Sequence, residues 1–440
     1  MGPVRERVER YLARTRERDR DLRAFIAVLA DRARRQADER DATPAARRGS
    51  LHGLTVSLKD NIDVAGVRST AGSAHHGGVP AARDATVTRL LDDAGAVVLG
   101  KNNMAEFAMG ATGRNAVFGD CRNARDGHRI AGGSSSGSGV AVAAELVEAA
   151  LGTDTGGSGR IPASVNGAVG LRPTVGRVSN RGVFPVSPSF DTVTPIAGDV
   201  RTVARVLAAL DRFDPDDPTA VPGERTPVDA LLGAGLDGLR VGVAGGFLAD
   251  GVEPGVRRVV ATATELMARH GATATPVTVA GAESAQERML EIMYPEAAGV
   301  HAERMRADPC SIDADVLRRL RIGAGTPEDV TQRARRWRRD FQARASEVFS
   351  RVDVVVCPTI PVDVPRADAV DLAASTRDLA RFTYVWAMYG GPSMSVPCGR
   401  HPESGMPVGL HLAAAPWRED VLLRAAAGYE AALGGRPNAR

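Results

Sequence analysis

Cysteine is scarce in this sequence, and apolar runs of membrane-spanning length are missing altogether. The cysteines lie far apart, with no C-x-x-C pair, at Cys121, Cys310, Cys357 and Cys398. This spacing argues against a disulfide framework and against a zinc knuckle. No apolar stretch reaches the roughly 20 residues that a transmembrane helix needs, and the stretch "MGPVRERVERYL" lacks the apolar region of a secretory signal. These absences predict a cytoplasmic protein with free thiols and no membrane partner.

The sequence also lacks a strong excess of charge of one sign. Lysine and arginine number 56, aspartate and glutamate 53, and the formal net charge is only +3. The clearest charged run, "RERVERYLARTRERDRDLR", mixes both signs, which is typical of a solvated helix face rather than a phosphate-binding stripe. We therefore expect no nucleic-acid partner, while a homodimer stays compatible with the sequence.

Segments typical of strands alternate with segments typical of helices, which predicts an α/β fold. Residues 1–45 indicate an N-terminal helical segment, and "TVSLK" at 55–59 ends an alternating, strand-like stretch. A further helix is expected at 140–149, "VAVAAELVEA". Residues 212–227 are rich in Pro and Asp, which indicates a surface loop that interrupts the fold without dividing it. We expect a single domain over residues 1–440.

The run "IAGGSSSGSG" at 130–139 allows three interpretations. A flexible linker joins separate units, whereas this run leads directly into a helix-forming segment. A nucleotide-binding P-loop needs a Lys followed by Ser or Thr after the glycines, and that pair is missing. The pattern G-x-S-x-G at 133–137 would make Ser135 the nucleophile of a hydrolase elbow. However, such an elbow follows an apolar strand, and the polar stretch "ARDGHRI" precedes this one.

A second hydroxyl-rich and glycine-rich cluster, "GTDTGGSGRIPAS", occupies residues 152–164. One helix-forming segment separates it from the first cluster, so Ser134 and Ser158 are expected to converge at one place. The pair Gly156–Gly157 lets the backbone approach a ligand without obstruction by a Cβ atom. Successive N–H groups there can hold one oxygen, which is how an oxyanion hole is built.

Lysine is almost absent: Lys59 and Lys101 are the only two, against a large excess of arginine. Arginine keeps its proton at working pH, whereas a desolvated lysine can lose it. Lys59 ends an apolar alternating stretch, so it is a candidate base for a serine nucleophile. The alternative for Lys59 is a structural ion pair with Asp60 or Asp63. The eight histidines lie mostly in polar, loop-like segments, where surface or structural roles are expected.

Taken together, these motifs resemble those of the amidase signature enzymes, which include the glutamyl-tRNA amidotransferase A subunits. The matching stretches stand in the family's order over about residues 50 to 430: "GLTVSLKDNIDVAG", "GAVVLGKNNMAEFAMG", "AGGSSSGSGVAVAA", "GTDTGGSGRIPAS", "GAVGLRPTVGRVSNRGVFP", "SFDTVTPIA", "YGGPSMSVPCG" and "MPVGLHL". The resemblance implies an α/β fold whose central mixed β-sheet is covered by helices on both faces.

The resemblance also implies a Ser-Ser-Lys triad. Ser158 matches the family's nucleophile, Ser134 its bridging serine after a cis peptide bond, and Lys59 its base. The supporting residues implied are Asp154 and Arg160, which brace the loop in the family. An oxyanion hole is implied at the backbone N–H groups of Thr155, Gly156, Gly157 and Ser158. Neither a metal nor an organic cofactor is expected.

The function expected from this resemblance is hydrolysis of a small-molecule amide through a covalent acyl-enzyme. Two alternatives remain: a ureide or allophanate-type hydrolase, and a glutamine-hydrolysing A subunit of a tRNA-dependent amidotransferase. The region "LRRLRIGAGTPEDVTQRARRWRRDF" lacks the tyrosine-rich stretch of the A subunits, which disfavours the second. A non-catalytic protein on the same fold is disfavoured because all three triad positions are kept. Asn102 and Ala105 are expected near the rim of the site, and the acyl-pocket candidates are Tyr384, Trp386, Met388 and Tyr389.

Overall fold

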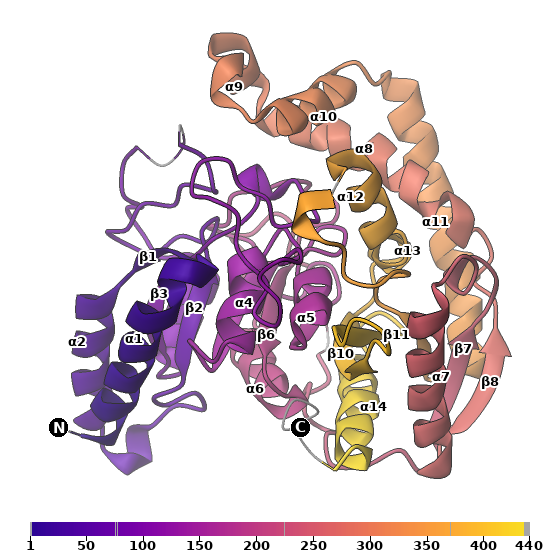
Figure 1. Cartoon of the computed structure of the whole chain (residues 1–440), viewed down its shortest axis with the longest axis horizontal. Helices are drawn as coiled ribbons and strands as arrows, with labels where there is room; N and C mark the ends of the chain where they lie inside the picture. The colour runs from indigo at the N-terminus through magenta and orange to yellow at the C-terminus, as the bar shows by residue number, and fades with distance from the viewer. Residues whose placement is uncertain (1, 75, 77, 224, 370, 435–440) are drawn as a thin grey trace.

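The fold is built around one mixed β-sheet (Figure 1). The computed structural model describes residues 2–74, 76, 78–223, 225–369 and 371–434. Over these residues the sheet has eleven strands in the order β1-β3-β2-β4-β6-β5-β10-β11-β9-β7-β8. The strands are β1 Phe25–Val28, β2 Thr55–Lys59, β3 Val97–Asn102, β4 Ala149–Thr153, β5 Val169–Arg172, β6 Val193–Ala197, β7 Arg240–Ala244, β8 Thr273–Val277, β9 Val354–Pro358, β10 Ser393–Arg400 and β11 Pro407–Ala414.

Helices cover both faces of this sheet, which confirms the expected α/β fold. In β3, Val97 and Leu99 pack with α1, α2 and α4 on one face, while Val98 joins α3 and α6 on the other. This alternation follows from the two-residue period of a strand. The helices are α1 Pro3–Leu22, α2 Ala30–Asp41, α3 Thr86–Asp93, α4 Ser136–Ala143, α5 Arg160–Asn166, α6 Val200–Leu210, α7 Pro254–Arg269, α8 Ala285–Val300, α9 Ala302–Ala307, α10 Ala314–Ala324, α11 Glu328–Arg351, α12 Leu372–Ala380, α13 Thr383–Tyr389 and α14 Glu419–Ala432.

The carboxyl ends of β2, β3 and β4 lie on the same side of the sheet. Strand β2 runs parallel to both β3 and β4, so Lys59, Asn102 and Thr153 all end their strands on the same side. The helices α8, α10, α11 and α13 pack on one another and form a group above this part of the molecule in Figure 1. We call α8 to α13 the helical lobe. The lobe thus lies on the side where polar strand ends meet.

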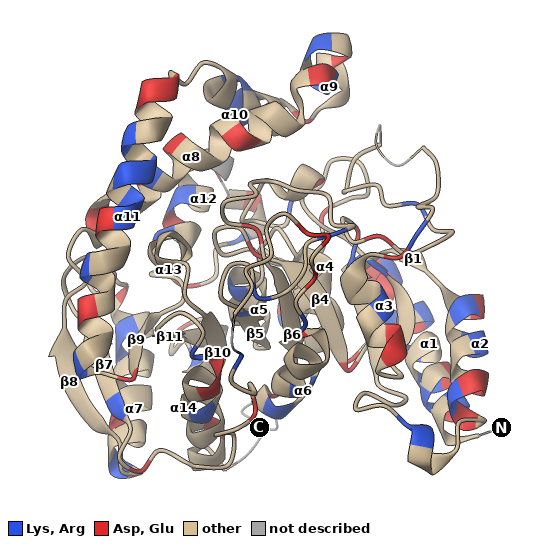
Figure 2. Ribbon diagram, turned by 180° about the vertical axis from the view of Figure 1, so that it is seen from behind, with Lys and Arg blue, Asp and Glu red and all other residues tan. Residues whose placement is uncertain are grey.

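Figure 2 shows charged residues of both signs along α1, α2 and α11, while most of the sheet carries neither. This distribution agrees with the mixed-sign pattern of the sequence. Among the described residues, no helix is long and apolar enough to cross a membrane.

Two sequence-based element predictions need correction. Residues 1–45 are not helical throughout, because Phe25–Val28 forms an edge strand that pairs antiparallel with β3. The helix expected at 140–149 is α4, which lies earlier and ends at Ala143. Glu145 adopts a left-handed conformation (φ 56°), which ends the helix and turns the chain into β4. Both differences arise from tertiary pairing, which local propensity does not report.

The segment 212–227 contains no helix or strand among its described residues, but it is anchored rather than freely solvated. Asp214 and Asp217 are buried. The Asp214 carboxylate accepts hydrogen bonds from the hydroxyls of Thr86 and Ser179, both at 2.7 Å. The segment therefore ties α3 to the loop that follows β5.

Candidate active site

Lys59 lies at the end of β2 with its side chain fully buried. Its Nζ is 2.7 Å from Ser134 Oγ and 2.8 Å from Thr153 Oγ1. Thr153 ends β4, the parallel neighbour of β2. The amine is therefore held between two hydroxyls that come from different segments, and one of them belongs to the serine-rich run.

Burial lowers the pKa of Lys59 from its ordinary 10.5 to about 7, although Asp154 and Asp191 act in the opposite direction. Desolvation disfavours the charged amine because water no longer solvates it. No carboxylate of the described residues forms an ion pair with Lys59. Asp60 instead pairs with Lys101, whose Nζ lies 3.1 Å from Asp60 Oδ1. The structural ion pair considered for Lys59 is therefore made by the other lysine.

Ser134 lies two residues before the start of α4 and is fully buried. The peptide bond between Gly133 and Ser134 is cis, as the family resemblance implies. A Cβ atom at position 133 would lie 2.6 Å from the carbonyl oxygen of Gly110, so only glycine fits there. The carbonyl of Ser134 also accepts a hydrogen bond from the Ala105 N–H at 3.1 Å. These contacts fix the backbone that presents the Ser134 hydroxyl to Lys59.

The hydroxyl and the N–H of Ser135 both form hydrogen bonds with the backbone of other segments. Its buried hydroxyl donates to the carbonyl of Thr153 (3.1 Å) and accepts from the Thr153 N–H (3.2 Å). The Ser135 N–H donates to the carbonyl of Ser158 at 3.1 Å. Ser135 therefore joins the serine-rich run to β4 and to the second glycine-rich cluster. This use of its hydroxyl disfavours the elbow interpretation, in which Ser135 would be the nucleophile.

Ser158 is half-buried in the turn between β4 and α5, and it lines a narrow cavity of about 40 Å³. Gly133, Gly156 and Gly157 line the same cavity, so the two glycine-rich clusters do converge. A Cβ atom at Gly156 would lie 2.1 Å from the ring of Tyr384, which lines the opposite wall. Glycine at 156 thus allows close approach between the turn and α13.

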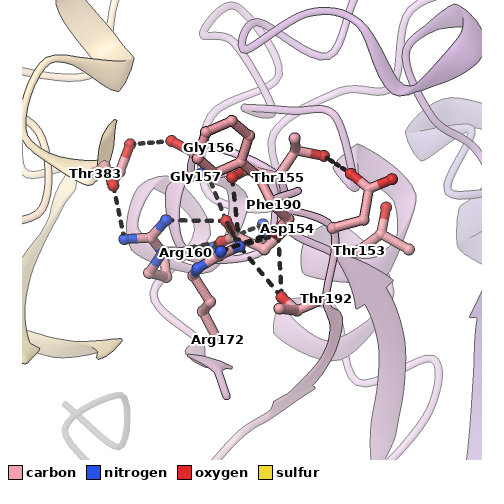
Figure 3. A network of polar contacts seen from close by, with 12 residues as sticks. Thr153, Asp154, Thr155, Gly156, Gly157, Arg160, Arg172, Phe190, Thr192 and Thr383 are labelled. Atoms are coloured by element: carbon pink, nitrogen blue, oxygen red, sulfur yellow. Dashed lines mark hydrogen bonds and ion pairs between the residues drawn. The ribbon is translucent and has the colours of Figure 1, made fainter. Parts of the chain in front are cut away.

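Asp154 is the centre of a buried polar network behind this turn (Figure 3). Arg160 donates to both of its carboxylate oxygens, from Nε and Nη2, each at 2.9 Å. The N–H groups of Gly157 (2.7 Å) and Gly159 (3.1 Å) also donate to the carboxylate. Burial alone would raise the pKa of Asp154, but Arg160 and Arg172 hold it below its usual range. Asp154 therefore remains an anion that clamps the backbone on both sides of Ser158.

The hydrogen bonds to Asp154 reduce the number of N–H groups that are free to form the expected oxyanion hole. The Gly157 N–H is directed to Asp154, whereas the sequence-based interpretation leaves it free for an oxyanion. Within the described chain, the N–H groups of Thr155, Gly156 and Ser158 form no hydrogen bond. The Thr155 hydroxyl donates to Asp191 Oδ1 at 2.6 Å, which anchors the start of the turn. Three of the four expected donors are thus available.

The cavity has a single ionised side chain among its described lining residues, Arg319 of α10. Its Nη1 donates to the carbonyl of Met109 at 3.3 Å, and its Nη2 forms an ion pair with Asp315. Asp315 also pairs with Arg318 at 2.7 Å, so one carboxylate serves two guanidinium groups. Arg319 therefore shares its carboxylate partner with Arg318. The sequence pattern indicates an arginine-rich helix here but gives Arg319 no role.

Of the aromatic residues proposed for an acyl pocket, one lines the cavity and two pack in the core. Tyr384 lines the cavity, whereas Trp386 is buried against His411 and Tyr389 stacks on Phe349. The two residues expected near the rim of the site also lie in different places. Ala105 lines a recess next to the cavity, while Asn102 is buried and donates from Nδ2 to the carbonyl of Ala24.

Three of the histidines, for which surface or structural roles are expected, lie in the interior. His301, His401 and His411 are almost completely buried, while His75 lies outside the described residues. His411 lies in β11, where its ring nitrogen Nε2 is 3.2 Å from Arg160 Nη1. The alternating stretch "PVGLHLAA" carries a strand signal, but it does not show which neighbour the inward histidine would meet.

Comparisons with known proteins find relatives that match nearly the whole chain. The family model described as Amidase matches residues 6–423. The A subunit of the glutamyl-tRNA(Gln) amidotransferase from Anaeromyxobacter dehalogenans (strain 2CP-C) is 38% identical, over 98% of this chain and 93% of that relative. The AtzE subunit of the 1-carboxybiuret hydrolase from Pseudomonas sp. (strain ADP) is 35% identical, over 96% and 93%.

Solved structures show the same fold. An inhibitor-bound structure of a vestigial protein complex, described in connection with the origins of an s-triazine catabolic enzyme, aligns with a TM-score of 0.94. Its sequence is 33% identical, and the alignment covers 100% of this chain and 97% of that one. The similarity therefore extends over the sheet and the helical lobe together.

Proposed function

Because the chain belongs to the amidase signature family, we propose that it hydrolyses the C–N bond of a small, non-peptide amide through a Ser-Ser-Lys triad. The observation that carries this proposal is the 2.7 Å contact between Lys59 Nζ and Ser134 Oγ, made by an amine whose pKa is lowered to about 7. An amine with this pKa is substantially neutral near pH 7, which a general base requires.

In the first half of the reaction, the Ser158 hydroxyl attacks the amide carbonyl carbon and a C–O bond forms. Its proton passes to Ser134, and Ser134 passes its own proton to Lys59. The carbonyl oxygen becomes an oxyanion, which the N–H groups of Thr155, Gly156 and Ser158 stabilise. Such donors lower the barrier because they are oriented before charge develops.

In the second half, the C–N bond breaks and the leaving nitrogen takes the proton back from Lys59 through Ser134. Ammonia or an amine departs, and Ser158 is left as an ester. Water then attacks the acyl carbon, with Lys59 again taking the proton through Ser134. The ester C–O bond breaks, the carboxylate product leaves, and Ser158 regains its proton. No step of this proposed reaction uses a histidine.

The lining of the cavity supports a narrower substrate class. Arg319 is the ionised group of its described wall, and the remaining lining is largely apolar or hydroxylic. A guanidinium in a partly buried wall favours a carboxylate partner. We therefore propose an amide or ureide that carries a carboxylate. This class includes glutamine, and it includes carboxylated ureides such as the 1-carboxybiuret that the name of one relative gives.

The proposal is tested by measuring ammonia release from the purified chain with matched substrate pairs. Succinamate and butyramide differ by a carboxylate in place of a methyl group, and allophanate and biuret differ by a carboxylate in place of an amide. Glutamine completes the panel. Ser158→Ala should abolish release, whereas Ser136→Ala, from the same serine-rich run, should retain it. Full activity in Ser158→Ala, or no release from any amide, would contradict the proposed function.

A further inference from the structure

Behind the turn that carries Ser158, a row of buried side chains extends away from the cavity into the sheet. Its members are Asp154, Arg160, His411 and Cys357, all almost completely buried. The proposed reaction uses none of the last three directly. His411 of β11 and Cys357 of β9 are register partners in the antiparallel ladder, so their side chains lie on one face of the sheet.

The two ring nitrogens of His411 face different partners. Nε2 lies 3.2 Å from Arg160 Nη1, and Nδ1 lies 3.8 Å from Cys357 Sγ. A guanidinium has donors only, so Nε2 must offer its lone pair to Arg160. The ring proton is then on Nδ1, where the Cys357 sulfur accepts it. This arrangement selects one neutral tautomer of His411.

The surrounding charges keep His411 in that neutral form. Burial and the adjacent Arg160 lower the pKa of His411 far below its ordinary value, against an opposing effect of Asp154. Burial raises the pKa of Cys357 to about 12, so the thiol stays uncharged as well. The groups facing His411 are therefore one cation, one more distant anion and one neutral thiol.

Arg160 connects this histidine to the reacting turn. Its Nη1 has His411 Nε2, the carbonyl of Thr383 (3.1 Å) and Ser393 Oγ (3.2 Å) as acceptors. Its Nε and Nη2 hold the two oxygens of Asp154, which in turn accepts from the N–H groups before and after Ser158. A change in the orientation of the guanidinium therefore shifts the carboxylate that fixes the Ser158 backbone.

We propose that His411 is a positioning residue for Ser158, acting through Arg160 and Asp154, and that Cys357 selects its tautomer. The inference rests on the proposed function, in which Ser158 is the nucleophile. If the ring turned its Nε2–H toward Arg160, two donors would face each other in a buried site, which is costly. The thiol of Cys357 opposes that state by accepting the Nδ1 proton.

The experiment follows phosphonylation of Ser158 by a serine-directed fluorophosphonate probe, in which the Ser158 oxygen displaces fluoride from phosphorus; it needs no knowledge of the physiological substrate. His411→Leu removes the acceptor and should slow labelling about tenfold, the effect of losing one hydrogen bond to a charged group. His411→Gln places Oε1 where Nε2 lies and should restore a rate near wild type. Cys357→Ala should slow labelling several-fold, while Cys357→Ser, which keeps an acceptor, should not.

A double-mutant cycle separates positioning from a packing effect. In the His411→Leu background, Cys357→Ala should cause no further loss, because the thiol acts only through the histidine. Equal labelling rates in wild type, His411→Leu and Cys357→Ala would overturn the inference, as would independent losses in the double variant. Labelling that persists in Ser158→Ala would instead contradict the proposed function. If His411→Leu does not fold, the two Cys357 variants still decide the question.

Discussion

Lys59 and Lys101 lie on neighbouring parallel strands, yet only Lys101 is paired with a carboxylate. Lys101 Nζ is 3.1 Å from Asp60 Oδ1, whereas Lys59 contacts the hydroxyls of Ser134 and Thr153. Both amines are fully buried. Burial lowers the pKa of both amines, but at Lys101 the adjacent Asp60 carboxylate opposes this shift, whereas the hydrogen-bond partners of Lys59 are hydroxyls.

Substitution of the two lysines should separate catalysis from stability. Lys59→Met is expected to lower kcat by about 10²–10⁴, the usual contribution of a general base, with the fold retained. Lys101→Met leaves Asp60 buried without its cation, which should lower the free energy of unfolding by about 3–5 kcal/mol. Steady-state kinetics and urea denaturation of both variants measure these effects. A wild-type kcat in Lys59→Met would refute the role of the base.

The activity should depend on pH through Lys59. Its pKa is about 7 in the folded protein, and only the neutral amine accepts the proton of Ser134. We expect kcat/KM to rise about tenfold per pH unit below pH ~7 and to level off above it. The measurement is a pH profile with the best substrate of the panel. An acid limb centred near the ordinary pKa of a carboxylic acid would point to another group.

The same pKa shift should make the free energy of unfolding depend on pH. The folded state lowers the pKa of Lys59 from 10.5 to about 7, so the unfolded chain binds more protons between these values. The unfavourable contribution of Lys59 is therefore full below pH ~7 and is relieved as the pH rises toward 10.5. The free energy of unfolding of wild type, relative to Lys59→Met, should increase between about pH 7 and about pH 9. A difference that is constant with pH would contradict the shift.

Arg319 should decide the preference for carboxylated substrates. Arg319→Met removes the cation from the cavity wall but leaves Asp315 paired with Arg318. We expect kcat/KM for succinamate to fall about 10- to 100-fold while that for butyramide changes little, because a charged hydrogen bond is lost for one substrate alone. Arg318→Met, whose side chain does not line this cavity, is the control. Equal losses for both substrates would show that Arg319 has only a structural role.

The contact between Gly156 and Tyr384 should be sensitive to a single methyl group. Gly156→Ala places a Cβ atom 2.1 Å from the Tyr384 ring, so the turn must shift. A displacement near 1 Å at reacting groups costs roughly 10²-fold in rate. Gly198→Ala is a matched control, because a Cβ atom there meets nothing within 4 Å. Comparison of kcat in the two variants checks the prediction; similar kcat values would contradict it.

Local sequence patterns predict the main strands and single out Lys59 and the two serine-rich and glycine-rich clusters, while the assignment of the triad comes from the family resemblance. They miss features that depend on distant partners. The edge strand β1 exists because β3 offers it hydrogen bonds, and propensity does not show that pairing. The engagement of the Gly157 N–H by Asp154 and the contact of His411 with Arg160 depend on the packed turn. Arg319 reaches the cavity only because the helical lobe folds over it.

One side of the cavity wall comes from a different stretch of the chain than the proposed reacting groups. Lys59, Ser134 and Ser158 belong to the first half of the sequence, whereas Met293, Arg319 and Tyr384 come from the helical lobe. The lobe side of the wall, which carries Arg319, is therefore separate in sequence from the proposed reacting groups. Exchange of residues 285–389 between relatives should transfer substrate preference while leaving the reaction itself unchanged. The fold offers a route by which one hydrolytic centre can acquire new substrates without rebuilding its reactive groups.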